Sequence, residues 1–233
     1  MDIIISWNIR HGGGGRITKI IDVLKKHNDA SIIVLSEFRK NENSESIQCA
    51  LTNLGFVHQY TATDDPKKNS VLIACKELFQ SETFPHLKEH SQRVIKISNK
   101  NFSLYGCYFP LQDAKKFVFD FLLNEVTTNP DEKIIITGDL NTGKHFIDEK
   151  DATFFHSHYL NKLEQENLFD AWRYFHKDKK EFTWFSNSKN GFRLDHFFVH
   201  NELKKNVKRC DYIHEYREHK ITDHSMMLLE LTD

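Results

Sequence analysis

Short apolar runs rich in β-branched residues recur along the whole chain and constrain its fold more than any other feature. Two of them, Ile32–Leu35 and Ile134–Ile136, are apolar at every position. A strand of this kind is covered on both faces, because an exposed face would carry polar residues at alternate positions. The runs predict strands at Ile3–Ser6, Ser31–Leu35, Val71–Cys75, Arg93–Ile97, Phe102–Tyr108, Lys133–Thr137, Leu194–Val199, Val207–Ile213 and Met226–Leu231.

Helical patterns lie between some of these runs. Apolar residues recur three and four positions apart in Ile17–Leu24, Ile47–Leu54 and Phe117–Leu122, and we expect a fourth helix over Thr153–Asn167. Strands that are buried on both faces need helices outside them, and several such strands in one chain predict two sheets packed face to face. The sequence therefore predicts an α/β fold with two sheets between helical layers.

Composition favours one globular domain over residues 1–233. Glycine (9) and proline (4) are sparse, and no linker rich in Pro, Gly or Ser divides the 233 residues. Lys and Arg total 32 against 33 Asp and Glu, a net charge of −1. This balance provides no bulk attraction to nucleic acid or to an anionic membrane, so a phosphate-bearing substrate must be held by a local site.

The sequence contains no segment that resembles a spanning helix or a secretory signal. The first residues, Met1–Trp7, lack a basic region and have the pattern of a strand. The four cysteines form no Cys-x-x-Cys pair, which disfavours a disulfide framework or a zinc ribbon and favours reduced thiols. We therefore expect a cytoplasmic protein without membrane association, and we expect it to be a monomer.

Polar side chains gather where the predicted strands stop or start. They are Asn8, Glu37, Tyr108, Asp139, Asn141, Asp195, Asp223 and His224. Polar groups at one end of a core sheet are where functional sites form. Hard oxygen ligands with few histidines and no cysteine favour Mg²⁺ or Mn²⁺ over zinc. A cation held by Glu37 and facing an Asp and a His is the equipment of phosphoester hydrolysis.

Seven short motifs follow one another in the order of a known family. They are Ser6-Trp7-Asn8, Leu35-Ser36-Glu37, Tyr108-Phe109-Pro110, Gly138-Asp139-Leu140-Asn141, Phe182-Thr183-Trp184, Arg193-Leu194-Asp195 and Thr222-Asp223-His224. In these the chain resembles the endonuclease/exonuclease/phosphatase superfamily, and within it the exonuclease III class of abasic-site endonucleases. The resemblance implies a four-layered α/β-sandwich of two packed mixed β-sheets flanked by helices, and a divalent-metal phosphoesterase.

The resemblance also implies a role for each matching residue. Glu37 looks like the principal metal ligand, with Asn8 beside it and Asp223 close to the metal. Asp139 resembles the residue that orients and deprotonates the attacking water. Asn141 would place that carboxylate and the phosphate.

Further positions bear on the phosphate and on the substrate. His224 would hydrogen-bond the scissile phosphate, oriented by Asp195. Tyr108 matches the phenol that the abasic-endonuclease branch directs at the phosphate. Trp184 and Phe192 match the aromatic pair that lines the pocket for an extruded abasic sugar in those enzymes.

Two arginines complete the expected substrate contacts. Arg10 stands where the family often has Asn or Asp, so a cation near the phosphate replaces a possible second metal ligand. Arg193 precedes the Leu-Asp of its motif, and we expect it to contact substrate. The segment from Tyr108 to Asp139 is shorter than in the repair enzymes, so a loop that would penetrate DNA is trimmed.

Three other patterns compete with this interpretation. Gly138–Lys144 fits the start of a P-loop, but His145 stands where Ser or Thr must bind magnesium. Gly12–Gly15 imitates a dinucleotide-binding turn but lacks the third glycine of the fingerprint. The pair His196 and His200 lies in a strand pattern, which favours packed histidines over zinc ligands.

We therefore expect a Mg²⁺- or Mn²⁺-dependent phosphodiesterase that hydrolyses DNA, at abasic sites or from 3′ ends. The alternative keeps the chemistry and changes the substrate to a small phosphoester, a lipid head group, RNA or a protein–DNA adduct. A non-catalytic binding module is disfavoured because Glu37, Asp139 and His224 are all present.

Overall fold

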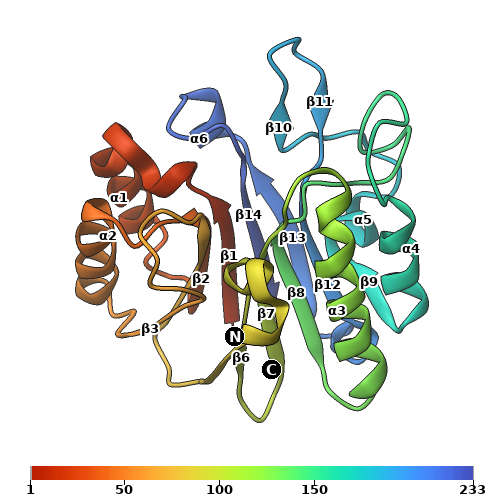
Figure 1. The fold of residues 1–233 in the computed structure, drawn as a ribbon, viewed down its shortest axis with the longest axis horizontal. Coiled ribbons are helices and arrows are strands. Elements are labelled where there is room, and N and C mark those ends of the chain that lie inside the picture. The colour runs from red at the N-terminus through yellow and green to blue at the C-terminus, as the bar shows by residue number, and fades with distance from the viewer. Residues whose placement is uncertain (1, 233) are drawn as a thin grey trace.

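Two six-stranded sheets lie face to face in the computed structural model, which describes residues 2–232 (Figure 1). The first sheet has the order β13 (Val207–Ile213), β14 (Met226–Leu231), β1 (Asp2–Asn8), β2 (Ile32–Phe38), β4 (Ser70–Cys75) and β3 (His58–Thr61). The second has the order β5 (Gln80–Thr83), β6 (Val94–Ser98), β7 (Ser103–Tyr108), β8 (Ile134–Asp139), β12 (Asp195–His200) and β9 (Leu168–Asp170). Only β1 with β2 and β7 with β8 pair in parallel, so both sheets are mixed.

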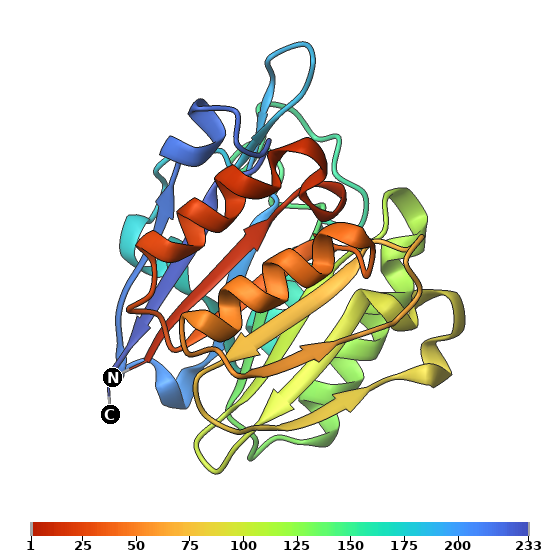
Figure 2. The ribbon, with the colours of Figure 1, turned by 90° about the vertical axis from the view of Figure 1, so that its left-hand side faces the viewer.

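Helices cover the outer faces of the two sheets. Figure 2 shows α1 (Ile17–Lys26) and α2 (Glu42–Asn53) lying across the first sheet. The second sheet is covered by α3 (Lys115–Thr128) and α4 (His158–Gln165). Short elements complete the chain: η1 (His11–Arg16), η2 (Pro85–Arg93), η3 (Gln112–Ala114), α5 (Ala171–His176), η4 (Asn201–Leu203) and α6 (Glu215–Glu218).

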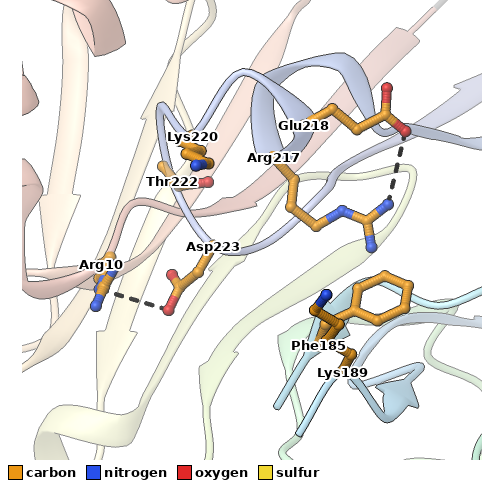
Figure 3. A pocket seen from close by; sticks show the side chains of 8 residues that line it. All are labelled: Arg10, Phe185, Lys189, Arg217, Glu218, Lys220, Thr222 and Asp223. Carbon is orange, nitrogen blue, oxygen red and sulfur yellow. Dashed lines mark ion pairs between the residues drawn. The ribbon is translucent and has the colours of Figure 1, made fainter. Parts of the chain in front are cut away.

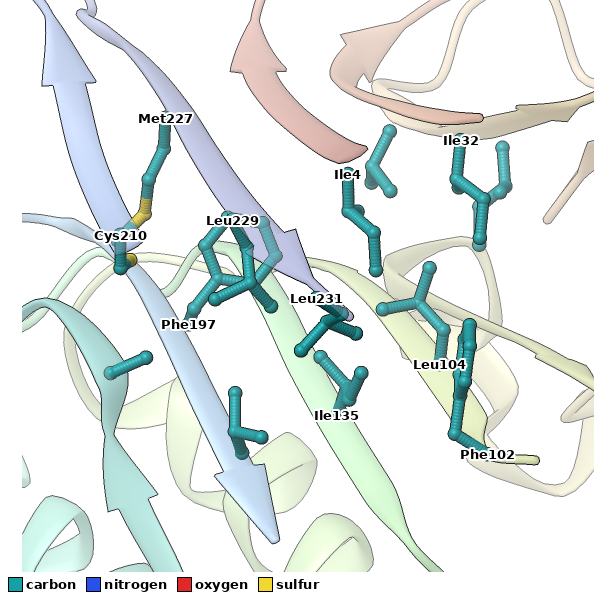
Figure 4. Packing of buried hydrophobic residues seen from close by; sticks show 14 of the residues in the cluster. Ile4, Ile32, Phe102, Leu104, Ile135, Phe197, Cys210, Met227, Leu229 and Leu231 are labelled. Atoms are coloured by element: carbon teal, nitrogen blue, oxygen red, sulfur yellow. The ribbon is translucent and has the colours of Figure 1, made fainter. Parts of the chain in front are cut away.

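Alternation of side chains along each central strand builds three apolar layers. In β1, Ile4 points between the sheets while Ile3 and Ile5 pack under α1 and α2. In β8, Ile135 joins the layer between the sheets, which Figure 4 shows, while its neighbours on either side pack under α3 and α4. Helix, sheet, sheet and helix are therefore the four layers, as the apolar runs and the resemblance predicted.

All nine predicted strands are present, and the unpredicted strands β3, β5 and β9 have only three or four residues each. The edge strand β5 is fully exposed and β3 is half-buried, so neither carries an apolar pattern. The helix predicted over Thr153–Asn167 is confined to α4, which corrects both of its ends. Its expected first turn is not helical because the Glu149 carboxylate accepts the backbone N–H groups of Thr153 and Phe154.

Between residues 2 and 232, the structure contains no helix with the length and apolar character needed to cross a membrane.

One buried ion cluster joins the second sheet to the loop that precedes α4. The Arg193 guanidinium, with no exposed surface, makes a bidentate pair with Asp148, at 2.7 Å to Oδ1 and 3.0 Å to Oδ2. It also pairs with Asp170, which caps the N-terminus of α5. Burial would raise the pKa of both carboxyls, but Arg193 outweighs it and holds each pKa below its usual range.

This cluster corrects the expectation that Arg193 contacts substrate. All of its charge is directed at buried carboxylates, and its backbone N–H donates to the Asp148 carbonyl at 2.8 Å. Arg193 therefore fixes the start of β12, where Asp195 lies.

Replacing Arg193 with Met should lower the free energy of unfolding at pH 7 by about 3–5 kcal/mol. The variant removes the cation that lies between Asp148 and Asp170 and leaves buried carboxylates short of a partner. Urea denaturation followed by circular dichroism measures the loss.

Arg209→Met is the matched control, since Arg209 makes an exposed pair with Glu230 at 2.8 Å. It should cost less than about 1 kcal/mol. Equal losses in the two variants would contradict a structural role for the buried cluster.

Candidate active site

The candidate functional side chains meet where the central strands of both sheets reach one edge of the sandwich. The parallel strands β1 and β2 end there, and so do β7 and β8 of the other sheet. The antiparallel strands β4, β12 and β14 begin at the same edge. In Figure 1 this edge carries the hairpin β10 (Trp184–Phe185) and β11 (Gly191–Phe192), and both termini lie at the opposite end.

The Asn8 side chain joins the two sheets at this edge. Its amide Nδ2 donates to Glu37 Oε1 at 3.0 Å and to Asp139 Oδ2 at 2.9 Å. Glu37 lies in β2 of the first sheet and Asp139 ends β8 of the second. A fully buried amide thus holds two carboxylates of opposite sheets in one site.

The Glu37 carboxylate is fixed by a strained backbone and by several donors. Its φ is 56°, which is rare for a residue other than glycine and is a form of strain that recurs at functional sites. Oε2 accepts the backbone N–H of His11 at 2.9 Å and the amide of Asn69 at 3.1 Å. The His11 ring also lies 3.0 Å from this oxygen.

Asp139 is buried and oriented by the turn that follows it. Its Oδ1 accepts the backbone N–H of Asn141 at 2.9 Å, and Asn141 has a φ of 50°. The Asn141 amide donates to the Phe109 carbonyl at 2.8 Å, and buried Lys115 donates to the Asn141 carbonyl. Burial raises the pKa of Asp139 above its usual range, and the neighbouring His224 charge opposes that shift.

A glycine permits this geometry just before Asp139. Gly138 has a φ of +135°, and a Cβ there would lie 1.9 Å from the Cys107 carbonyl oxygen. Strands β7 and β8 therefore approach closely at the end that carries Tyr108 and Asp139.

His224 forms a dyad with Asp195 beside Asp139. Its Nδ1 donates to Asp195 Oδ2 at 2.9 Å, while Nε2 lies 3.9 Å from Asp139 Oδ2. Burial alone would lower the pKa of His224, but Asp195 and Asp139 outweigh it and raise that pKa well above its usual range. Ligand-type atoms of the three residues lie within 4.8 Å of one another.

The Asp223 carboxylate has one oxygen that a divalent cation could bind. Its Oδ1 is buried without a hydrogen-bond partner, and its Oδ2 lies 3.4 Å from Nε of Arg10. An unpaired buried carboxylate oxygen is costly, and a cation would satisfy it. Glu37 and Asn8, the other two predicted ligands, would add a carboxylate and an amide oxygen, the types of donor that Mg²⁺ and Mn²⁺ prefer.

Aromatic side chains border the polar centre. Tyr108 is half-buried beneath the Arg93 guanidinium, 4.7 Å from the ring centre. Burial, with help from Glu37 and Asp139, raises the pKa of Tyr108 to about 12.

The second aromatic group is the cross-strand pair of the hairpin. Trp184 faces Phe192, with ring centres 5.8 Å apart, and its ring centre lies 6.5 Å from that of His224. Both rings are half-buried, so each keeps some open surface beside the dyad.

Thr183 shows why the hairpin sits beside the dyad. Its buried hydroxyl accepts the backbone N–H of Leu194 at 3.0 Å, and its carbonyl accepts that of Ser225 at 2.9 Å. It thereby ties the base of the hairpin to the starts of β12 and β14, which carry Asp195 and follow His224.

The predicted site residues other than Arg193 lie around this edge, within one network or beside it. They are Asn8, Arg10, Glu37, Tyr108, Asp139, Asn141, Trp184, Phe192, Asp195, Asp223 and His224. Sequence reasoning missed His11 and Asn69, which hold Glu37. Asn69 precedes β4, and the start of a strand antiparallel to β2 is the signal that would have revealed it.

This arrangement combines three capacities for chemistry on a phosphoester. It has a buried carboxylate with a raised pKa as a proton acceptor, an imidazolium held by a carboxylate, and oxygen donors for a hard cation.

Comparison with known proteins identifies the family of the chain. Residues 5–224 match the sequence model of the Endonuclease/Exonuclease/phosphatase family. No curated protein matches the chain significantly in sequence.

Three solved structures share the fold over essentially the whole chain. The 3′ phosphatase NExo from Neisseria, bound to product DNA hairpin, is 20% identical with a TM-score of 0.84, and all of each chain is covered. An AP endonuclease from Archaeoglobus fulgidus is 18% identical with a TM-score of 0.80, also with both chains fully covered. The 3′-5′ exonuclease NExo from Neisseria meningitidis is 19% identical with a TM-score of 0.82, covering 99% of this chain and 100% of that one.

At these identities the structures establish the architecture, and the sequence match, which covers most of the chain, establishes descent. The resemblance inferred from the seven motifs is thereby confirmed, and the chain belongs to the endonuclease/exonuclease/phosphatase family of hydrolytic enzymes.

Proposed function

We propose that this chain, as a single catalytic domain over residues 1–233, is a divalent-metal-dependent phosphodiesterase that hydrolyses DNA at abasic sites or from 3′ ends. The observation that carries the proposal is the hydrogen-bonded line from Glu37 through Asn8 to Asp139, with the His224–Asp195 dyad at its end. It joins a candidate cation site to a candidate base and a cationic donor.

Asp139 accepts the proton of the attacking water. Two N–H donors, from Asn8 and Asn141, hold its oxygens in one orientation, and burial gives it the raised pKa that suits a base. Asn141 keeps this orientation because its own amide is bound to the Phe109 carbonyl.

His224 and Tyr108 donate to the phosphoryl oxygens. At 3.9 Å, His224 Nε2 is too far from Asp139 for a direct hydrogen bond, so this donor stays available to the substrate. The Asp195 carboxylate keeps the imidazole protonated and oriented. The raised pKa of Tyr108 keeps its phenol protonated at neutral pH.

Glu37, Asn8 and Asp223 would hold Mg²⁺ or Mn²⁺, and the bound ion would neutralise the charge of the phosphate. Arg10 adds a cation beside this position, where its Nε lies 3.4 Å from Asp223.

DNA is the substrate that the similar structures favour. The Neisseria and Archaeoglobus proteins are described as a 3′ phosphatase, a 3′-5′ exonuclease and an AP endonuclease, and one is bound to a DNA hairpin. Trp184 and Phe192, beside His224, form the aromatic wall for a sugar without its base.

We further propose a cytoplasmic monomer, consistent with four cysteines that are all free thiols.

Asp139→Asn should lower metal-dependent turnover about a thousandfold, because the amide cannot accept the proton of the water. The fold should survive, because the side chain keeps its shape and one oxygen acceptor. Initial rates on abasic duplex DNA and a thermal melt measure the two effects.

Asp120→Asn is the control for the same chemical change outside the site, because the Asp120 side chain lies on the exposed face of α3. It should retain the wild-type rate. Wild-type turnover by Asp139→Asn on any good substrate would remove Asp139 from the mechanism.

Glu37→Gln should weaken the binding of Mg²⁺ or Mn²⁺ about tenfold or more, because a charged oxygen ligand is lost. Calorimetric titration of the folded protein with each metal measures the affinity. Glu202→Gln, on the exposed η4 turn, loses the same charge and should not change it. An identical metal titration for Glu37→Gln would exclude Glu37 as a ligand.

A panel of substrates tests the specificity. Abasic duplex, 3′-recessed duplex, single-stranded DNA, RNA and bis(4-nitrophenyl) phosphate are compared by kcat/KM with Mg²⁺ and with Mn²⁺. We expect abasic or recessed duplex DNA to be cleaved fastest. A strong preference for the generic ester or for RNA would overturn the DNA proposal and support a phosphodiesterase of the same family with another substrate.

A further inference from the structure

A cavity opens next to Asp223. Its volume is about 610 Å³, and it lies between the β10–β11 hairpin, the turn after α6 and the end of β1. Figure 3 shows Phe185 and Lys189 on one wall, Arg217 above them, and the Arg10–Asp223 pair at the other end.

The hairpin wall is a flat aromatic surface held in place. Phe185 is 43% exposed as a residue, the Arg217 guanidinium lies over its ring at 4.5 Å from the centre, and the Phe182 ring is at 83° to it. Arg217 is itself anchored, because its Nη1 donates to the Phe182 carbonyl at 3.0 Å. A fixed ring with open surface is a stacking platform for another planar group.

The rim of the cavity is cationic. Exposed Lys189 and Lys220 add two ammonium groups to Arg10 and Arg217. The two acids of the wall are each close to an arginine, since Glu218 lies 3.9 Å from Arg217 and Asp223 lies 3.4 Å from Arg10. The free charge of this cavity is therefore positive, which suits a phosphate.

The cavity and the candidate active site share a wall. Asp223 adjoins His224 in the chain, and Arg10 follows Asn8 by two residues with its backbone N–H on the Asn8 amide oxygen at 2.9 Å. A group bound in the cavity is thus near a phosphate bound at His224. The cavity therefore offers an aromatic surface for a base and cations for a phosphate, beside the candidate phosphate site. These features are complementary to a nucleotide.

We propose that this cavity binds the nucleotide next to the scissile phosphate of a DNA strand, with its base stacked on Phe185 and Arg217 and its phosphate at Lys189 and Lys220. The inference rests on the proposed function and adds that the flanking base must be unstacked from its neighbours. The chain should then grip single-stranded or frayed DNA through this cavity.

Binding of a fluorescein-labelled single-stranded DNA oligonucleotide to the full chain, by fluorescence anisotropy in EDTA and low salt, tests the stacking. Phe185→Ala should raise Kd about tenfold or more, as expected for the loss of one base–aromatic contact. Arg217→Lys keeps the charge but removes the planar group, and should also raise Kd.

Phe175→Ala is the matched control, because Phe175 is 38% exposed on α5 and outside this cavity. It should bind as the wild type does. A Kd for Phe185→Ala within twofold of the wild type, an equal loss for Phe175→Ala, or no binding by the wild type would each overturn the inference.

The salt dependence of DNA binding tests whether the lysines of the rim contact phosphate. Lys189→Ala and Lys220→Ala should each reduce the slope of log Kd against log salt by about 0.7, as expected for one lost phosphate contact on a single strand. Unchanged slopes in both variants would show that neither Lys189 nor Lys220 contacts a phosphate of the bound DNA.

Hydrolysis distinguishes failure of the inference from failure of the function. The ratio of kcat/KM for the oligonucleotide to that for bis(4-nitrophenyl) phosphate should fall about tenfold in Phe185→Ala and stay constant in Phe175→Ala. If the wild type cleaves both substrates and Phe185→Ala leaves the ratio unchanged, the proposed function stands and the proposed role of the cavity is wrong. If the wild type binds DNA through Phe185 but cleaves neither substrate, the DNA-binding role of the cavity stands and the proposed function is wrong.

Discussion

The arrangement of the candidate site depends on two hydrogen bonds that the Asn8 side-chain amide donates. This amide is fully buried and donates to one carboxylate of each sheet, Glu37 at 3.0 Å and Asp139 at 2.9 Å. Without these donors, two like charges would approach in a low-dielectric interior, which is costly. The amide therefore permits the carboxylates to converge, and it sets the relative position of the two sheets at the edge where they are needed.

The strain around this amide follows from the same constraint. Glu37 and Asn141 both have φ values near 50°, and each directs a polar group back across the edge of its sheet. Such conformations persist only where the surroundings hold them. Here the holding groups are the His11 backbone and Asn69 for Glu37, and Lys115 and the Phe109 carbonyl for Asn141. These hydrogen bonds hold both strained residues, and with them the polar groups of the candidate site, in place.

The sequence predicted the architecture because buried strands leave apolar runs that any central position must keep. It missed β5 because an exposed edge strand carries no such run. The structure places the motif residues at strand ends, as expected, but it buries Arg193, which was expected to contact substrate. An arginine beside Asp195 suits either substrate or scaffold, and only Asp148 and Asp170, 45 and 23 residues away in the chain, decide the matter. Long-range pairs of this kind are fixed by packing and leave no local pattern.

The near-neutral composition conceals a strong local asymmetry. The 33 acidic residues include the buried carboxylates of the site, whose charge a divalent cation would offset. Immediately beside Asp223, the rim of the cavity lined by Phe185 and Arg217 carries Arg10, Lys189 and Lys220. A strand of DNA would therefore meet positive charge at two adjacent places on a molecule with no net attraction for it. If the chain acts on DNA as proposed, its affinity comes from contacts with a few nucleotides, and a duplex without an exposed or damaged nucleotide offers few of these contacts.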